Sequence, residues 1–121
     1  MSGKKTLVLG ASTNPSRYSF LAINKLRAYG HPVVAVGLRE GKLGDVAIVK
    51  DKPVEEHIDT VTLYLNPTNQ KPYYDYILSL NPTRIIFNPG TENPELEEMA
   101  EKNGIMVMEA CTLVLLSIGK Y

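Results

Sequence analysis

The sequence is poor in the residues from which disulfides and metal sites are built. It contains one cysteine and two histidines among 121 residues. A single cysteine excludes an internal disulfide framework, and two histidines without a Cys or His cluster argue against a structural zinc site. We therefore expect no metal site.

An excess of charge of either sign is also missing. Lys and Arg total 13, as do Asp and Glu, so the formal net charge is zero. This balance argues against a nucleic acid held on a broad basic face and against a polybasic membrane anchor. We expect neither partner.

Long apolar runs are absent as well. No run approaches the ~20 apolar residues that span a bilayer, and the run from Thr6 to Gly10 is too short for a secretory signal. We expect a cytoplasmic protein.

What remains is the composition of one packed domain. Hydrophobic residues make up 44% of the chain and charged residues 21%, a mixture typical of folded rather than disordered proteins. The length fits a single domain over residues 1–121.

Strand-like and helix-like segments alternate along the chain. Short apolar runs bounded by Gly, Pro or Asn predict strands, and near-helical spacing with capping residues predicts helices. The expected strands cover residues 5–10, 32–37, 60–65, 84–87 and 105–108, with a weaker one at 46–49 and a polar loop at 38–45. The expected helices cover residues 18–29, 69–80 with Thr68 as N-cap, and 94–102 with Asn93 as N-cap, while 112–118 is a helix or an edge.

This alternation predicts an α/β fold. We expect a Rossmann-like, doubly wound, mainly parallel five-stranded sheet with helices on both faces. Ligands of such sheets lie beyond the carboxyl ends of the strands. The loops that follow Gly10, Gly37, Leu65 and Phe87 are therefore the candidate binding loops.

The loop after the first strand is typical of a phosphate site. Small residues there let a phosphate approach the backbone N–H groups of the following helix. Ser12, Asn14 and Ser19 can donate hydrogen bonds to it, and Arg17 can bind it bidentately. Only its first residue is glycine, so it is not a full dinucleotide fingerprint. The alternative is that Ser12 or Ser16 caps the helix and Arg17 stays solvated.

The loop after the second strand indicates the kind of nucleotide. An NAD site needs an acidic residue there to bind the ribose hydroxyls. The sequence instead has Arg39, with Lys42 nearby, and these would attract a phosphorylated ribose. The residues favour coenzyme A or NADP over NAD, the alternative being that both are ordinary loop charges.

Several short motifs, taken in order, resemble those of a known family. They are Val8-Leu9-Gly10-Ala11-Ser12 with Asn14-Pro15 and Arg17-Tyr18-Ser19, then Asn88-Pro89-Gly90-Thr91, then Met108-Glu109-Ala110-Cys111-Thr112. From about Lys4 to Leu115 the chain resembles the small stand-alone CoA-binding domain proteins, which are related to the CoA-binding domain of the succinyl-CoA synthetase alpha subunit. The resemblance implies a Rossmann-like fold that binds coenzyme A.

The resemblance also implies which residues bind. The implied pyrophosphate side comprises Gly10, Ala11, Ser12, Asn14, Arg17 and Ser19; Gly37, Leu38 and Arg39 meet the adenosine and its phosphate; Leu65, Asn66, Pro89 and Gly90 border the other flank. One feature departs from the family pattern. The family usually has Asn-Pro and a basic residue after the second strand, where this chain has Gly37-Leu38-Arg39.

Three functional hypotheses follow. The first is a protein that binds coenzyme A or acyl-CoA without catalytic residues of its own. The second is an enzyme: an NADP-dependent reductase, or a subunit of an acyl-CoA ligase that needs a partner chain. The third is a Rossmann-like interaction domain that has lost its ligand.

Other residue groups leave alternatives open. Cys111 is a candidate for thiol exchange with coenzyme A or a buried small hydrophobe. Tyr73, Tyr74 and Tyr76 can stack on adenine or pack against the sheet. The acids Glu92, Glu95, Glu97 and Glu98 are most simply a solvated helix start. The apolar tail 113–118 is a core helix or the interface of a homodimer.

Overall fold

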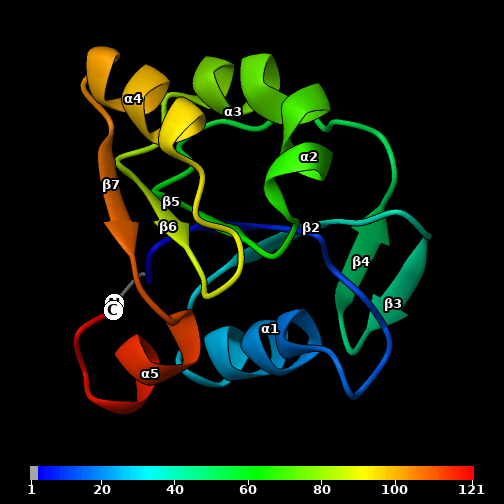
Figure 1. Ribbon diagram of the computed structural model, residues 1–121. Coiled ribbons are helices and arrows are strands. Elements are labelled where there is room, and N and C mark those ends of the chain that lie inside the picture. Colours follow the sequence, from blue (N-terminus) through cyan, green and yellow to red (C-terminus); the bar gives the residue numbers. More distant parts are fainter. Residues whose placement is uncertain (1–2) are drawn as a thin grey trace.

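The computed structural model describes residues 3–121, which form one seven-stranded sheet covered by helices on both faces (Figure 1). The strands are β1 (Thr6–Leu9), β2 (Val33–Val36), β3 (Gly41–Leu43), β4 (Val46–Val49), β5 (Thr60–Leu63), β6 (Arg84–Phe87) and β7 (Met106–Glu109). The helices are α1 (Tyr18–Ala28), α2 (Pro67–Gln70), α3 (Tyr74–Leu80), α4 (Pro94–Lys102) and α5 (Thr112–Ser117), with a 3-10 turn at Lys71–Tyr73 between α2 and α3.

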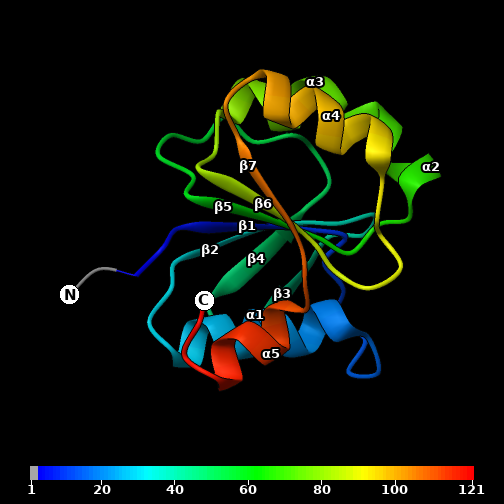
Figure 2. The same ribbon diagram turned by 60° about the vertical axis from the view of Figure 1, so that its left-hand side comes forward.

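The strand order across the sheet is β3-β4-β2-β1-β5-β6-β7. All neighbouring strands run parallel except β3, which pairs antiparallel with β4. Helices α2, α3 and α4 cover one face, and α1 and α5 cover the other, as the two views show (Figures 1 and 2). The predicted α/β class and mainly parallel sheet are confirmed.

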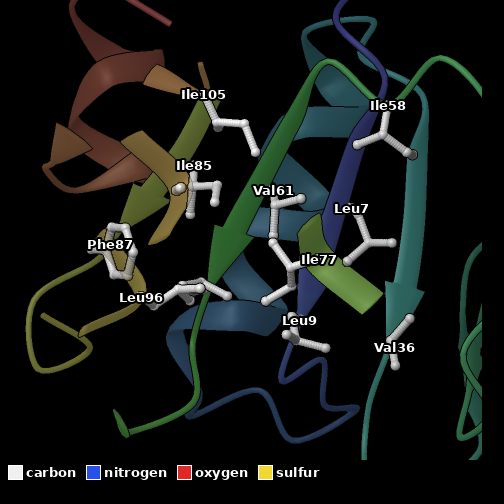
Figure 3. Packing of buried hydrophobic residues seen from close by; sticks show 12 residues of the cluster. Leu7, Leu9, Val36, Ile58, Val61, Ile77, Ile85, Phe87, Leu96 and Ile105 are labelled. Carbon is white, nitrogen blue, oxygen red and sulfur yellow. The ribbon is translucent and has the colours of Figure 1, made fainter. Parts of the chain in front are cut away.

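The central strand β1 shows why the sheet needs helices on both faces. Successive side chains of a strand point to opposite faces, so Leu7 and Leu9 join one core cluster while Val8 joins the other. All three are fully buried. The cluster beneath α3 and α4 contains Ile77 and Leu96 beside these leucines (Figure 3).

The expected number of five strands is wrong, because two further strands extend one edge. The weak segment β4 pairs parallel with β2, with Ala35 opposite Ile48. Residues 41–43, expected in a loop, form β3 and turn back through a two-residue connection in which Gly44 has φ +60°. Such a positive φ suits glycine in a tight hairpin. A three-residue Gly-Lys-Leu strand has too little apolar pattern to be recognised without its partner.

The expected helix over 69–80 is also interrupted and begins earlier. Asn66, not Thr68, is the N-cap of α2, and its Oδ1 accepts a hydrogen bond of 2.9 Å from Asn69 N–H. Pro72 lies in the 3-10 turn that separates α2 from α3, where its missing N–H and its ring disfavour a continuous helix. Asn93 caps α4 as predicted, with Pro94 as its first residue.

Within residues 3–121, none of the helices has the length and apolar character needed to cross a bilayer. The ambiguous segment 112–118 is the helix α5, whose Leu116 is buried in the cluster beneath α1.

Candidate functional site

The main cleft lies at the carboxyl ends of β1 and β5, where the chain leaves the two paired strands toward opposite faces of the sheet. Helix α1 follows β1 on one face of the sheet, and α2 follows the neighbouring β5 on the opposite face (Figures 1 and 2). The loops leaving these two parallel strands therefore separate at the sheet edge, which is the position where open α/β sheets form ligand sites.

The cleft has a volume of about 830 Å³. Four loops line it, those after β1, β2, β5 and β6. The lining residues are Gly10, Ala11, Ser12, Thr13, Asn14, Ser16, Arg17, Tyr18, Ser19, Leu38, Arg39, Tyr64, Leu65, Asn66, Asn69, Pro89 and Thr91.

The floor of the cleft depends on two glycines. Gly10 has φ +97°, and a Cβ there would lie 3.0 Å from the backbone of Tyr64. A Cβ at Gly37 would lie 2.3 Å from the carbonyl oxygen of Ala11. The N–H groups of Gly10 and Ala11 both donate to Val36 O, at 2.8 and 2.9 Å. The first loop is thus held directly against the end of β2, with no room for a side chain between them.

Side chains of the first loop hold its conformation and keep donors available. Ser12 Oγ accepts a 3.0 Å hydrogen bond from Asn14 N–H, and Asn14 Oδ1 accepts from Ser16 N–H (3.0 Å) and from Ser16 Oγ (2.8 Å). Because both side chains are used as acceptors, the Ser12 hydroxyl hydrogen and the Asn14 amide N–H groups remain available for a ligand. Neither serine caps α1.

The N-terminus of α1 faces this loop without a cap. Its N-cap residue Arg17 makes no capping hydrogen bond through its side chain, and the first turn contains no acidic residue. The first N–H groups of a helix have no partner within the helix and carry the positive end of its dipole. The start of α1 is therefore suited to an anion.

Positive charge in the cleft is unopposed. Arg17 and Arg39 are both exposed and line the cleft. Within residues 3–121, the ion pairs are Lys5–Glu55, Arg27–Asp45 and Lys102–Glu98, so neither cleft arginine is paired. The lining contains no Asp or Glu. A protein of zero net charge thus presents a locally cationic cleft.

The opposite wall is fixed by two buried amides. The amide of Gln70 donates to Leu65 O and Thr91 O, each at 2.8 Å, which joins the loops after β5 and β6. Asn88, at the end of β6, donates to Thr62 Oγ1 (2.7 Å) and Leu63 O (2.8 Å). These bonds tie the segments that follow β5 and β6 to each other and to the end of β5.

Tyr64 lines the cleft from the α1 and α5 side of the sheet, as a neutral phenol. Burial raises its pKa to about 12, while the hydroxyls of Thr112 and Thr62 beside it lower the pKa by less. Those two hydroxyls hydrogen-bond to each other at 2.8 Å, and the buried Tyr64 hydroxyl has no hydrogen-bond partner within residues 3–121. Its ring is the part that faces the cavity.

The structure brings most of the proposed site residues together. All of them line the cleft except Gly37, which lies behind Ala11, and Gly90, whose N–H donates to Glu92 Oε1 in the turn after β6. Sequence reasoning missed further lining residues, namely Thr13, Ser16, Tyr18, Tyr64, Asn69 and Thr91. Most lie within or beside the motifs already identified, whereas Asn69 reaches the cleft only through the position of α2.

The remaining candidates lie elsewhere. Tyr73, Tyr74 and Tyr76 pack against the core cluster beneath α3, so the packing interpretation is confirmed, and none of them lines the cleft. Cys111 lines a smaller cavity that adjoins the cleft. His31 accepts a 2.9 Å hydrogen bond from Lys4 N–H at the amino-terminal ends of β1 and β2, whereas the cleft lies at their carboxyl ends.

The side chains of the cleft limit its chemistry. They supply hydroxyl, amide, guanidinium and aromatic groups, and the lining contains no His, Cys, Lys or carboxylate. These groups can bind and orient a phosphate-bearing ligand. They do not include the usual general base or nucleophile–base pair.

Comparison with known proteins agrees with this geometry. The family model described as CoA binding domain matches residues 4–117. A crystal structure described as that of an uncharacterized protein is 50% identical, covers 100% of both chains and has a TM-score of 0.96. Comparison with curated proteins gave no match.

Two more distant structures share the fold. A Thermus thermophilus protein is 24% identical over 98% of this chain and 90% of its own, with a TM-score of 0.85. A hypothetical protein from Pyrococcus horikoshii is 20% identical over 92% of this chain and 80% of its own, with a TM-score of 0.83.

Proposed function

The chain belongs to the CoA binding domain family, and from this premise we propose that its main cleft binds coenzyme A or an acyl thioester of it. The observation that carries the proposal is the charge of the cleft: among residues 3–121, it contains two arginines without an ion-pair partner and no carboxylate. Coenzyme A carries a pyrophosphate and a ribose 3′-phosphate, so it complements such a site.

The sheet supports the same ligand. Without the edge strand β3, the order is β4-β2-β1-β5-β6-β7, which corresponds to the 3-2-1-4-5-6 order of Rossmann folds. We therefore assign a Rossmann-like, doubly wound fold, with the cleft at its topological switch point. In this fold the pyrophosphate lies at the start of the first helix, which here is the uncapped α1.

Each part of coenzyme A has a proposed place. The pyrophosphate binds the loop after β1 through Gly10, Ala11, Ser12, Asn14, Arg17 and Ser19. The adenosine and its 3′-phosphate lie against the loop after β2, at Gly37, Leu38 and Arg39. The pantetheine arm runs past Leu65, Asn66, Pro89 and Gly90. Gly37 acts indirectly here, by allowing the close contact with Ala11.

One feature supports a binding protein rather than an enzyme. The lining of the cleft supplies hydroxyl groups but no His, Cys, Lys or carboxylate beside them to act as a general base. We propose that the protein carries or senses the cofactor. Any ligase-type reaction would need residues from a partner chain.

Calorimetric titration with coenzyme A, dephospho-coenzyme A and NADPH tests the proposal. We expect coenzyme A to bind at least tenfold more tightly than the dephospho form, because Arg39 makes a charge-assisted contact worth about 1.5–3 kcal/mol with the 3′-phosphate. Tight NADPH binding without coenzyme A binding would identify an NADP protein instead. Absence of heat with all three would favour an interaction domain without a ligand.

A matched pair of variants tests whether Arg39 contacts the 3′-phosphate. Arg39→Gln should lower coenzyme A affinity to that of dephospho-coenzyme A. Arg27→Gln removes the same charge from a half-buried residue of α1 that is paired with Asp45 on the hairpin, and should leave both affinities unchanged. Equal losses in the two variants would indicate only a general charge effect.

A further inference from the structure

A second, smaller cavity adjoins the main cleft. Its volume is about 220 Å³, and its walls are formed by Tyr18, Tyr64, Asn88, Pro89, Cys111 and Leu113. Tyr18, Tyr64 and Pro89 also line the main cleft, so the two spaces meet at these three side chains. The remaining walls come from the residue after β6 and from the N-cap and first turn of α5.

The walls of the cavity contain no charged side chain, and the side-chain amide of Asn88 is fully engaged. The Asn88 side chain uses its NH₂ on Thr62 Oγ1 and Leu63 O, and its Oδ1 accepts a 2.9 Å hydrogen bond from Thr112 N–H. The Tyr64 hydroxyl is buried, so Tyr64 contributes its ring. Pro89 and Leu113 add hydrocarbon. A cavity of this kind favours an apolar group over an ionic one.

The position of the cavity corresponds to one end of the proposed ligand. The adenosine end is placed at the loop after β2, whereas the cavity lies at the carboxyl ends of β5, β6 and β7, on the other side of β1 from that loop. In coenzyme A the sulfur is at the end of the pantetheine arm remote from the adenine. A ligand lying along the sheet edge in this direction brings its sulfur, and any group attached to it, to the cavity.

We propose that this cavity binds the acyl group of a short-chain acyl-CoA thioester, so that the protein prefers such a thioester to free coenzyme A. The inference rests on the proposed function and names the ligand class within it. A volume of about 220 Å³ equals roughly seven water molecules at about 30 Å³ each. It accommodates a chain of a few carbons and not a fatty acyl chain.

A chain-length series measures this directly. The probes are coenzyme A, acetyl-CoA, butyryl-CoA and octanoyl-CoA in calorimetric titrations. Affinity should rise about fourfold for each methylene group buried, so butyryl-CoA should bind roughly tenfold or more tightly than acetyl-CoA, and octanoyl-CoA should lose the gain. Equal affinities for coenzyme A and all thioesters would overturn the inference and leave coenzyme A binding intact. Failure of every ligand would contradict the proposed function itself.

Substitutions at two neighbouring residues of α5 test whether the preference for butyryl-CoA arises in this cavity. Leu113→Trp fills the cavity and should reduce the butyryl-CoA preference to about one while coenzyme A affinity stays within about twofold. Val114→Trp changes the next residue, which is 53% exposed and does not line the cavity, and should keep the preference. Retention of the preference in Leu113→Trp would place the acyl group elsewhere.

Labelling of Cys111 gives a test that needs no substitution. Cys111 is the single cysteine of the chain and lines the cavity, so its rate of alkylation by iodoacetamide reports cavity occupancy. Saturating butyryl-CoA should slow alkylation severalfold more than saturating acetyl-CoA does, and neither thioester has a free thiol that would consume the reagent. Equal rates with the two ligands would show that the acyl group does not enter.

Discussion

Gly37 and Ala11 approach so closely that a Cβ on residue 37 would lie 2.3 Å from the Ala11 carbonyl oxygen. This contact brings the end of β2 against the loop after β1, and so joins the proposed adenosine side of the cleft to the proposed pyrophosphate side. Position 37 requires glycine because a side chain would not fit, and not because of its backbone conformation, since Gly37 does not have a positive φ.

Gly37→Ala should therefore destabilise the fold and weaken ligand binding. An added methyl group against a fixed backbone typically costs about 1–3 kcal/mol, to be measured by urea unfolding. Gly41→Ala is the control, because its new Cβ meets chiefly the terminal methyl of the Thr13 side chain, which can rotate. If the two variants unfold at the same urea concentration, the Gly37–Ala11 contact is not a constraint.

Arg17→Gln should affect every pyrophosphate ligand equally. Arg17 lies at the start of α1 and Arg39 at the end of the β2 loop, so only Arg39 should distinguish the 3′-phosphate. We expect about a tenfold loss for both coenzyme A and dephospho-coenzyme A in Arg17→Gln, with a weaker salt dependence of binding. A loss confined to coenzyme A would exchange the roles assigned to the two arginines.

Asn88→Ala should cost more stability than its size suggests. Asn88 makes three buried hydrogen bonds that join β5, β6 and α5. Truncation leaves the Leu63 carbonyl and Thr112 N–H without these partners, a loss of about 2–4 kcal/mol. Asn103→Ala, which removes one exposed hydrogen bond to Met99 O, should cost less than about 0.5 kcal/mol. Urea unfolding of both variants compares the two sites, and similar losses would contradict the linking role.

Glu97→Gln should raise stability near neutral pH. Burial raises the pKa of Glu97, and Glu109 raises it further through a hydrogen bond and charge repulsion. The folded state thus favours the protonated form, so the contribution of Glu97 is present below its usual pKa of 4.5 and is lost as pH rises through the raised pKa. A neutral glutamine still accepts the hydrogen bond from Asn93 N–H and avoids this loss.

Thermal unfolding between pH 3.5 and 8 measures the effect. The Glu97→Gln melting temperature should exceed that of the wild type at pH 7, and the difference should vanish at the acidic end. The control is Glu98→Gln, which removes a carboxylate paired with Lys102 and should give no gain. A pH-independent difference for Glu97→Gln would exclude the titration of Glu97 as its cause.

Local sequence patterns were sufficient for the parallel core and for most of the cleft. Some features depend only on residues that are close together along the chain. They are the apolar runs of β1 and β6, the Asn93–Pro94 start of α4 and the small residues after Gly10. The loops after parallel strands necessarily meet at one sheet edge. Ser12, Arg17 and Arg39 were therefore predictable as residues of the same cleft.

Packing between segments far apart in the chain decided the features that local patterns did not predict. The strand β3 exists because β4 offers it a partner. Helix α2 begins at Pro67, after the N-cap Asn66, because the Asn66 side chain, rather than that of Thr68, reaches the free N–H of Asn69. Tyr64 and Asn69 enter the cleft through the placement of β5 and α2.

The sequence by itself thus determined the α/β class, the order of the principal elements and the location of positive charge, because these follow from periodicity, capping and residue type. Only the tertiary structure decided that Arg17 and Arg39 lack acidic partners, that Gly37 must be glycine to admit Ala11, and that Cys111 and Leu113 line a small cavity beside the cleft. These properties depend on distances between segments far apart in the chain, which no local pattern contains.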